Sequence, residues 1–402
     1  MTSLGNIEAT PLASLTFISF TTGDILYLTG TAKTLFGPAA QHIMPLQNIL
    51  TTVHVTGYTL VQDALPVRQR PNTTAQPSPY SPPIRFLAEE APAATYFNKD
   101  AQVSALLTRI DILSPSLATF TWESSKELQI KPGQAAVLDF TSVIGAAEYQ
   151  HMAPAKPTFV NDDRIRTWTV STSSPPAGTR TFSLTMREKH GGAVTGALFA
   201  IARKLAEAKP ELLSNTRLLE LTVRIMGISG DFVLPEPKQS IGDDELGITV
   251  PQKALTSKIP KKLLWIAGGI GVTPFLSMLS FVTSSLDDND WDIALVLSTR
   301  EPDILLPLIS SAIAGKSAKH RVHLSLDIFS DEQIPDLDAD VVLRRHAGRV
   351  PRTFFAGATS VIDLESREVY VCGPELFEKA VVAALADANI DPKDVRREGF
   401  GY

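Results

Sequence analysis

A glycine-rich segment carries the strongest chemical signal in the sequence. It reads AGGIGVTPFLSML over residues 267–279 and follows an apolar run. Gly268, Gly269 and Gly271 allow the backbone to turn sharply and to approach a ligand without Cβ clashes. Thr273 is expected to cap the helix that follows, with a proline at the first helical position. The N–H groups and dipole of that helix would form an anion site suited to a pyrophosphate. Without a ligand, the segment would be only a tight strand-to-helix turn.

A second group of candidate residues lies in the strand-like run RTWT, where Thr167 separates Arg166 from Trp168. The arginine offers a forked charge for a phosphate, and the tryptophan offers an aromatic face for a flat ring. Thr169 adds a hydroxyl. Alternation along a strand places Arg166 and Trp168 on one face and Thr169 on the other. Taken alone, the run is better explained by a surface arginine beside a core tryptophan.

The segment HGGAVTGAL, residues 190–198, is a further candidate anion site. Gly192 and Val194 lie just ahead of Thr195, which is expected at the N-cap of a helix. The helix start would then present its N–H groups to a phosphate. Simple capping, with no ligand, is an equal explanation of this pattern.

The fourth candidate is VYVCGPELF, where an apolar strand ends in Cys372 and a helix begins after Gly373 and Pro374. Ligands bind at the carboxyl ends of the strands in open α/β sheets. A lone buried cysteine is more often part of the packing. Because Cys372 is the only cysteine, the chain alone forms no internal disulfide, four-cysteine iron–sulfur cluster or Cys-rich zinc site. No metal ligands are predicted.

The elements around these motifs fall into two patterns. Short strand-like runs with turns between them dominate the middle of the chain and predict an antiparallel barrel with one helix, TGALFAIARKLAEA. From Pro260 onward, almost continuously apolar strands alternate with helices, which predicts a doubly wound parallel sheet. The expected organisation is a β-rich segment over 1–67, a Pro-rich linker over 68–92, the barrel over 93–237, a connector over 238–259 and the α/β domain over 260–402.

Length and charge limit the function classes. The 402 residues allow two or three domains, and the formal net charge of −6 makes nucleic acid or an anionic membrane an unfavourable partner. No run reaches the roughly 18 consecutive apolar residues of a spanning helix. The first residues lack the charged region and cleavage site of a secretory signal. We therefore expect a cytoplasmic protein without a membrane span.

Taken together and in their order along the chain, the four motifs resemble the ferredoxin–NADP reductase superfamily, whose members join a flavin-binding barrel to a nicotinamide-dinucleotide domain. The resemblance covers roughly Ala93 to Tyr402. RTWT is similar to the family's Arg-x-aromatic-Ser/Thr motif, with tryptophan and threonine in place of the usual tyrosine and serine. The stretch GISGDF over 227–232 is similar to the segment that often closes the barrel.

This resemblance implies roles for individual residues. Arg166 would bind a flavin phosphate, Trp168 would pack by the flavin ring, and Thr169 would lie near flavin N5. Gly192 to Thr195 would be a phosphate loop, and Gly268 to Pro274 the dinucleotide loop. The residues that would lie near the nicotinamide or the flavin ring are Cys372, Gly373, Pro374, Glu398, Phe400 and Tyr402. The expected catalytic residues are Thr169 of the barrel motif, Cys372 and Glu398.

The resemblance also implies the cofactors. FAD is expected rather than FMN, with NADPH or NADH as the electron source. Ser298 and Arg300 follow the second apolar strand, where the adenosine ribose lies in this fold, and they favour a 2′-phosphate and hence NADPH. A solvent-facing arginine is nearly as good an explanation. Hydride would pass from the nicotinamide to the flavin, and electrons would leave to a separate redox protein or a small organic acceptor.

Two alternatives remain open at the level of sequence. The chain could be a non-redox module that retains flavin or nucleotide as a structural element, or a reductase dedicated to one biosynthetic intermediate. The N-terminal stretch SLGNIEATP with LTFISFTTGDILYLTGTA resembles the last third of a pyridoxamine-phosphate-oxidase-like split barrel. About three strands form only a marginal domain, so this piece is expected to pack on the rest of the chain or on a second copy in a homodimer.

Overall fold

The computed structural model describes residues 2–70, 78, 80–81, 85–90, 94–97, 102–145, 157–175, 177–235, 260–284, 290–314, 322–337, 341–356, 362–364 and 366–399. The chain divides into two compact units, one of residues 1–96 with 146–163 and one of residues 97–145 with 164–402. None of the helices in these described ranges is long and apolar enough to cross a membrane.

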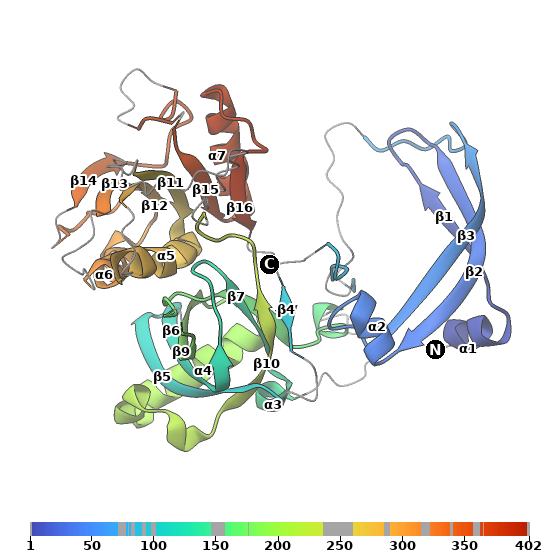
Figure 1. The fold of residues 1–402 in the computed structure, drawn as a ribbon, viewed down its shortest axis with the longest axis horizontal. Coiled ribbons are helices and arrows are strands. Elements are labelled where there is room, and N and C mark those ends of the chain that lie inside the picture. The colour runs from blue at the N-terminus through green and yellow to red at the C-terminus, as the bar shows by residue number, and fades with distance from the viewer. Residues whose placement is uncertain are drawn as a thin grey trace, which may run out of the picture. The chain divides into compact units, whose positions relative to one another are not determined.

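The first unit is built on a three-stranded antiparallel sheet. Its strands, in spatial order, are β1 (Leu12–Ile18), β2 (Ile25–Phe36) and β3 (Ile49–Val61), as the alternating apolar runs predicted (Figure 1). The short helices are α1 (Thr2–Ala9), α2 (Pro38–Ile43) and a 3₁₀ turn at Pro157–Phe159. A two-residue strand, β4 (Thr95–Tyr96), ends its first stretch of chain.

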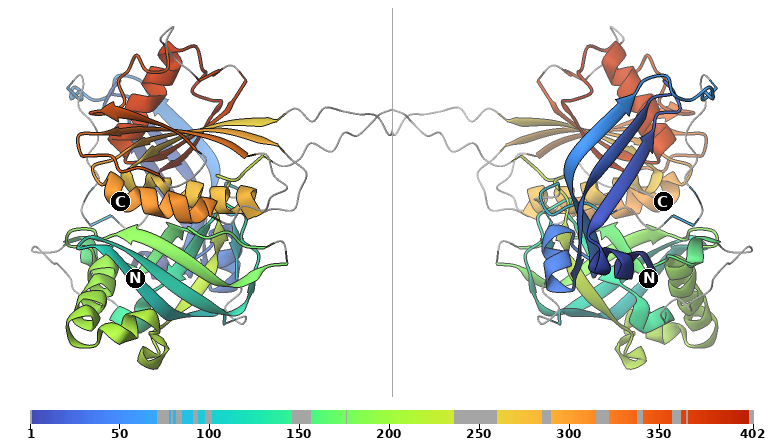
Figure 2. Two further views of the ribbon diagram at one scale, coloured as in Figure 1. Left: turned by 90° about the vertical axis from the view of Figure 1, so that its left-hand side faces the viewer. Right: turned by 90° about the vertical axis from the view of Figure 1, so that its right-hand side faces the viewer.

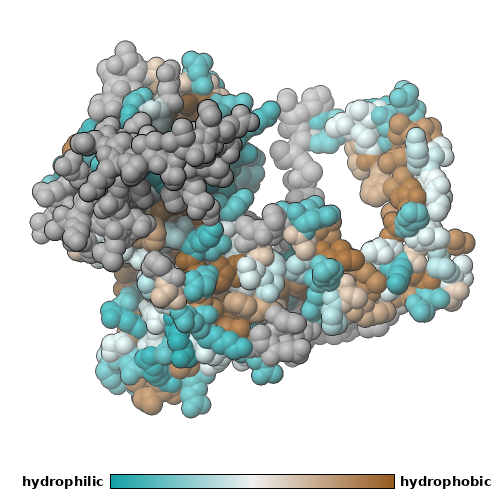
Figure 3. All heavy atoms as spheres, viewed as in Figure 1, coloured by the Kyte–Doolittle hydropathy of each residue, from teal (hydrophilic) through white to brown (hydrophobic). Residues whose placement is uncertain are grey.

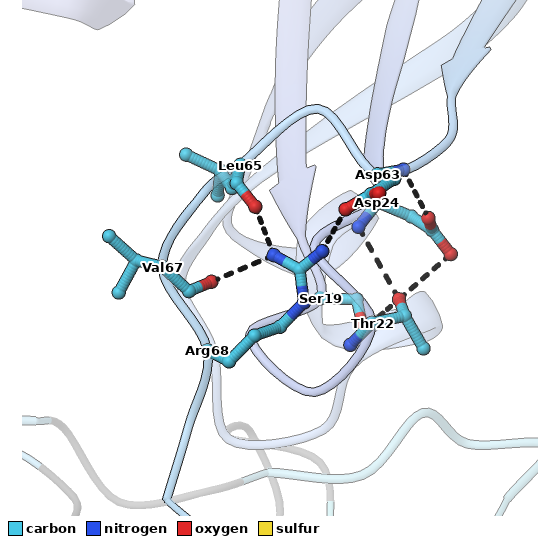
Figure 4. Close-up of polar contacts among 7 residues, drawn as sticks. All are labelled: Ser19, Thr22, Asp24, Asp63, Leu65, Val67 and Arg68. Carbon is cyan, nitrogen blue, oxygen red and sulfur yellow. Dashed lines mark hydrogen bonds and ion pairs between the residues drawn. The ribbon is translucent and has the colours of Figure 1, made fainter.

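The turn between β1 and β2 is closed by polar contacts (Figure 4). Gly23 has a φ of +80°, which glycine adopts without strain. The Thr22 hydroxyl donates to Asp24 at 2.8 Å, and the backbone N–H of Asp63 donates to the same carboxylate at 2.8 Å. Arg68 in turn pairs with Asp63. The end of β3 and the start of the following segment are thereby tied to the β1–β2 turn.

The first domain of the second unit is an antiparallel sheet curved around a core. Its strand order is β8-β7-β10-β5-β6-β9. The bounds are β5 (Ser104–Ser114), β6 (Leu117–Leu128), β7 (Ala135–Asp139), β8 (Ile165–Thr169), β9 (Thr179–Arg187) and β10 (Thr222–Ser229). Beyond the end of β8, the Ser171 N–H donates to the Ser183 carbonyl at 2.9 Å, so the two outer strands meet. The sheet is therefore closed into a barrel, as predicted.

Helix α4 (Ala193–Ala208) packs its apolar side on the barrel core. Val194, Leu198 and Leu205 are buried, in line with the helical spacing of apolar residues in the sequence. Three shorter helical pieces accompany the barrel: α3 (Thr141–Ile144) and the 3₁₀ turns Pro210–Ser214 and Arg217–Leu219.

The second domain is a six-stranded parallel sheet in the order β14-β13-β12-β11-β15-β16. Its strands are β11 (Lys261–Gly268), β12 (Trp291–Ser298), β13 (Val322–Ser330), β14 (Val342–Ala347), β15 (Glu368–Gly373) and β16 (Val395–Gly399). Its helices are α5 (Thr273–Ser284), α6 (Pro302–Ile313) and α7 (Glu375–Asp387). Helices α5 and α6 cover one face and α7 the other (Figure 2). The expected fold class, an antiparallel flavin-type barrel followed by a doubly wound α/β domain, is confirmed.

The barrel and the parallel-sheet domain share a core. Phe232, just beyond β10, packs edge-on against Phe275 of α5 and Tyr370 of β15, with ring centroids 5.7 and 5.3 Å apart. The Tyr370 hydroxyl donates to the Val233 carbonyl at 3.0 Å. The backbone N–H of Gly133, in the barrel, donates to the Ser277 hydroxyl at 2.9 Å. Both domains are thus held in one compact unit by buried aromatic and polar contacts.

Candidate active site

The candidate site begins where the parallel sheet changes winding direction. From β11 the chain runs to β12 on one side, whereas β15 pairs with β11 on the other. The carboxyl ends of these two strands, Gly268 and Gly373, therefore bound the crevice in which open α/β sheets take ligands. The sequence placed both glycines in the site, and the structure brings them together.

Close packing explains three of the glycines at this point. A Cβ on Gly268 would lie 2.6 Å from the Phe377 ring, and one on Gly373 would lie 2.7 Å from it. A Cβ on Gly271 would lie 2.2 Å from the carbonyl oxygen of Cys372. These positions accept only glycine because the turn after β11, the end of β15 and the first turn of α7 touch one another.

Gly269 differs from the other glycines of the loop. Its φ is +54°, and a Cβ there would meet nothing within 4 Å. The backbone of this half-buried residue therefore has open space beside it, as a phosphate-binding loop requires. The open space fits a dinucleotide that approaches the main chain of the loop.

The expectation that Thr273 caps the helix is wrong. The residues Gly269–Val272 form a 3₁₀ turn that runs directly into α5, and Thr273 has helical dihedral angles of −56° and −44°. Gly268, with extended dihedral angles, stands at the N-terminal boundary instead. The helical N–H groups therefore start at Gly269, nearer to the end of β11, and Thr273 is buried with 2% of its surface exposed.

Cys372 and Glu398 are neighbours across the β15–β16 pair. Cys372 is fully buried, and burial, followed by the carboxylates of Glu398 and Glu378, raises the pKa of its thiol well above the usual value. Burial and the nearby Asp231 raise the pKa of Glu398 to about 7. The thiol is therefore held neutral, while the Glu398 carboxyl exchanges a proton near neutral pH. Phe400 and Tyr402 lie outside the described residues.

The barrel motif lies on β8 at the edge next to β7. Trp168 is half-buried and packs edge-on against Phe140, with ring centroids 5.4 Å apart, on the core side of the sheet. Arg166 shares that face and donates to the Ile165 carbonyl at 2.9 Å. Thr169 is buried on the opposite face, whereas Thr167 is exposed.

Thr195 is not the N-cap of α4, which corrects the expectation from sequence. The helix begins at Ala193, and Gly192 occupies the cap position without a side-chain bond. The Thr195 hydroxyl instead accepts a hydrogen bond from the Lys189 N–H at 3.1 Å, across the turn that enters the helix. Val194 is buried in the barrel core.

A depression lies over the start of α4. It is lined by Ser116, Glu188, Lys189, His190, Gly191, Gly192 and Gly196. Arg203 pairs with Glu188 at 2.7 Å and lowers the pKa of that carboxyl. The start of α4 thus borders a surface hollow that contains Lys189, His190 and one carboxylate, Glu188, whose charge is paired with Arg203.

The remaining predicted residues lie along the carboxyl edge of the parallel sheet. Ser298 ends β12 and pairs with Gly268 in the register of the neighbouring strand, and Arg300 is exposed just beyond it. Pro374 stands at the N-cap of α7 with extended dihedral angles. The sequence therefore located the strand ends correctly.

Sequence reasoning did not single out Phe377 or Asp231 as site residues. Phe377 packs against the two strand-end glycines, and Asp231 acts electrostatically on Glu398. The available signals were an aromatic residue in the first turn after the Gly-Pro pair and an acidic residue inside the barrel-closing stretch. Neither signal is specific without the contact that the fold creates.

Comparisons with known proteins point to a reductase module. Residues 265–383 match the family model of the oxidoreductase NAD-binding domain. NADH-cytochrome b5 reductase 2 of Yarrowia lipolytica is 28% identical over 135 residues, which span 33% of this chain and 42% of that protein. The carnitine monooxygenase reductase subunit of Escherichia coli is 31% identical over 159 residues, 39% of this chain and 41% of that protein. The chain thus spans about two fifths of these relatives.

Solved structures include a similar chain, the flavohem-like FAD/NAD binding domain of nitric oxide dioxygenase from Vibrio cholerae. The two chains are 16% identical, with a TM-score of 0.43, and the match covers 74% of this chain and 98% of the Vibrio cholerae chain. The family match over residues 265–383 and the reductase relatives confirm the resemblance to the ferredoxin reductases. The resemblance of the N-terminal sheet to a split barrel stays a prediction.

Proposed function

We propose that this chain, whose parallel-sheet domain matches oxidoreductase NAD-binding domains, is a flavin-dependent NAD(P)H oxidoreductase. FAD, bound by the barrel, and a nicotinamide nucleotide, bound by the parallel sheet, would supply the hydride and electron chemistry. Electrons would leave to a separate redox protein or a small organic acceptor. A cytoplasmic location belongs to the same proposal.

The observation that carries this proposal is the arrangement at the switch point. The open space beside the Gly269 backbone adjoins two packed strand ends, and the shared core holds the barrel against the same domain. Such a crevice can hold a dinucleotide with its pyrophosphate at the loop and its reactive ring toward Cys372. The residues of the chain would position the ring and exclude water.

The flavin phosphates are assigned to the barrel residues Arg166 and Thr195. Ser171, just after β8, pairs with Ser183 of β9. In an antiparallel pair, moving back along β8 to Arg166 means moving forward along β9, to the turn before α4 that contains Lys189. This direction supports a phosphate site between the Arg166 guanidinium and the start of α4. Arg166→Ala should then lose flavin on purification, and retention of flavin at the wild-type level would reject the assignment.

Rapid anaerobic mixing tests the function directly. Purified protein mixed with NADH or NADPH should lose its oxidised flavin absorbance, whereas a non-redox module would keep it unchanged.

The same mixing experiment also tests whether the protein prefers NADPH or NADH. Arg300, exposed at the end of β12, is suited to a 2′-phosphate, so Arg300→Ala should impair NADPH use far more than NADH use. An equal effect on both nucleotides would reject a 2′-phosphate contact.

A further inference from the structure

The three-stranded sheet of the first unit has two chemically different faces. Cross-strand register places Leu28 of β2 beside Leu15 of β1 and Tyr58 of β3, and alternation assigns every second residue to the same face. We call this the apolar face. The other face is mixed: threonines, one lysine and one histidine alternate with apolar residues such as Tyr27 and Val61.

The apolar face is exposed to a degree that is unusual for a folded protein. Tyr58 is 76% exposed and Phe36 is 56% exposed. Its most exposed large side chains are Phe17, Phe36, Ile49, Val55, Tyr58 and Leu60. Apolar side chains gather over β1–β3 in the space-filling view (Figure 3). A contiguous apolar surface of this kind marks an interaction site.

The described residues of the second unit offer no matching surface. Its exposed large apolar residues are scattered over β5, a 3₁₀ turn, β14 and α7: Ile112, Leu218, Leu219, Val342 and Leu376. On the opposite face of the sheet, the exposed apolar residues are interspersed with polar ones: Leu12, Ile18, Tyr27 and Val61. Among the described parts of the chain, the most continuous apolar surface, and the one best matched to the apolar face, is therefore the apolar face itself.

Charge and area also favour a second copy. The strand residues of the apolar face include no Asp, Glu, Lys or Arg, so two copies would meet without like-charge repulsion. The longest strand has 13 residues. At about 3.3 Å per residue and about 4.8 Å between strands, the face projects on the order of 500 Å². Because side chains project from the sheet, the accessible area of the face is larger than this projected area. It approaches the roughly 600–1,000 Å² per partner that specific interfaces bury.

We propose that the apolar face of β1–β3 is a homodimer interface, in which two copies of the sheet pack face to face around a twofold axis. The same residues then serve both partners, as in any isologous contact. The opposite, mixed face remains toward solvent. This proposal does not depend on flavin or nicotinamide binding.

Light scattering on the eluting full-length chain tests it. Wild-type protein should elute at twice the mass of one chain and dissociate on dilution. Tyr58→Asp should weaken the dimer by about 100-fold or more, because each dimer would bury two unpaired carboxylates in place of two rings. Thr59→Asp, one residue away on the opposite face, is the matched control and should leave the dimer intact.

Circular dichroism checks that both variants remain folded. A wild-type chain that is monomeric throughout the micromolar range would overturn the proposal, since its own second unit or another segment would then cover the face. A dimer that persists unchanged in folded Tyr58→Asp would also overturn it, because the contact would lie elsewhere. Equal weakening by both substitutions would reject the assignment of the face.

Discussion

Cys372, the single thiol of the chain, combines complete burial with a place at the ligand edge of the sheet. Its raised thiol pKa argues against a nucleophilic thiolate. We expect Cys372→Ser to slow flavin reduction while flavin content and nicotinamide binding stay near normal, because small misplacements of reacting groups can cost roughly a hundredfold in rate. Stopped-flow absorbance measures this rate, with Cys372→Ala separating polarity from volume. An unchanged rate in both variants would assign the thiol to core packing alone.

Glu398 should make both the rate of flavin reduction and the free energy of unfolding depend on pH. Its pKa is about 7 in the folded protein, whereas an unfolded glutamate titrates near its ordinary value of 4.5. The folded state therefore holds the proton more tightly, and the stabilisation that this gives is complete below the unfolded pKa and is lost as pH rises through 7. Glu398→Gln should flatten the fall in stability between these values.

Denaturant titrations at a series of pH values measure this effect. In the same variant, the inflection near pH 7 that we expect in the flavin-reduction rate should disappear. A wild-type free energy of unfolding that does not change over this pH range would contradict the raised pKa of Glu398. Glu368→Gln, at an exposed pair with Arg396, is the control and should leave the profile unchanged.

At the scale of elements, the loop after β11 depends on contact with the end of β15. Gly271→Ala would bring a Cβ to 2.2 Å from the backbone carbonyl of Cys372, so one of the two segments must shift. We expect nicotinamide binding to weaken and flavin content, which depends on the barrel, to stay normal. Equilibrium titration with the nucleotide checks this. Gly5→Ala in α1, where the added methyl meets nothing, should bind like wild type, and equal affinity in both variants would contradict the close contact.

Most elements with a regular apolar pattern could be predicted from the sequence. Strands β11, β12, β13 and β15 are buried on both faces and read as continuous apolar runs. β14 was not predicted because its run VLRRHA is charged. In the fold, Arg344 and His346 contact the buried Asp327 at 2.6 and 2.8 Å, which makes a strand of these residues possible. Such pairing between distant residues has no local signature.

The helix starts show the same limit at finer detail. Both Thr195 and Thr273 have the residue type and position of an N-cap, yet glycines with extended dihedral angles occupy the boundaries. A hydroxyl near a helix start can bond backward across the turn, as that of Thr195 does to the Lys189 N–H. Sequence identifies the hydroxyl and the helix, but the direction of the preceding chain decides which residue caps.

At the scale of the whole second unit, Phe232 links the barrel to the parallel sheet. Replacing it with alanine removes its contacts with Phe275 and Tyr370 and should cost about 3–5 kcal/mol. We expect calorimetry to show the barrel and the parallel-sheet domain melting separately in Phe232→Ala. Phe199→Ala, which lies wholly within the barrel core, should lower the melting temperature without splitting the transition. A single transition in Phe232→Ala would mean that other contacts suffice to couple the domains.

The shared core also bears on how this module can be recombined. A hybrid that joins this barrel to the parallel-sheet domain of another reductase would place Phe232 and Leu117 against foreign side chains. The rings that Phe232 contacts, Phe275 of α5 and Tyr370 of β15, come from segments far apart in the sequence. A functional chimera would therefore need these partners transplanted together, so the natural unit of exchange is the barrel and the parallel sheet as a pair.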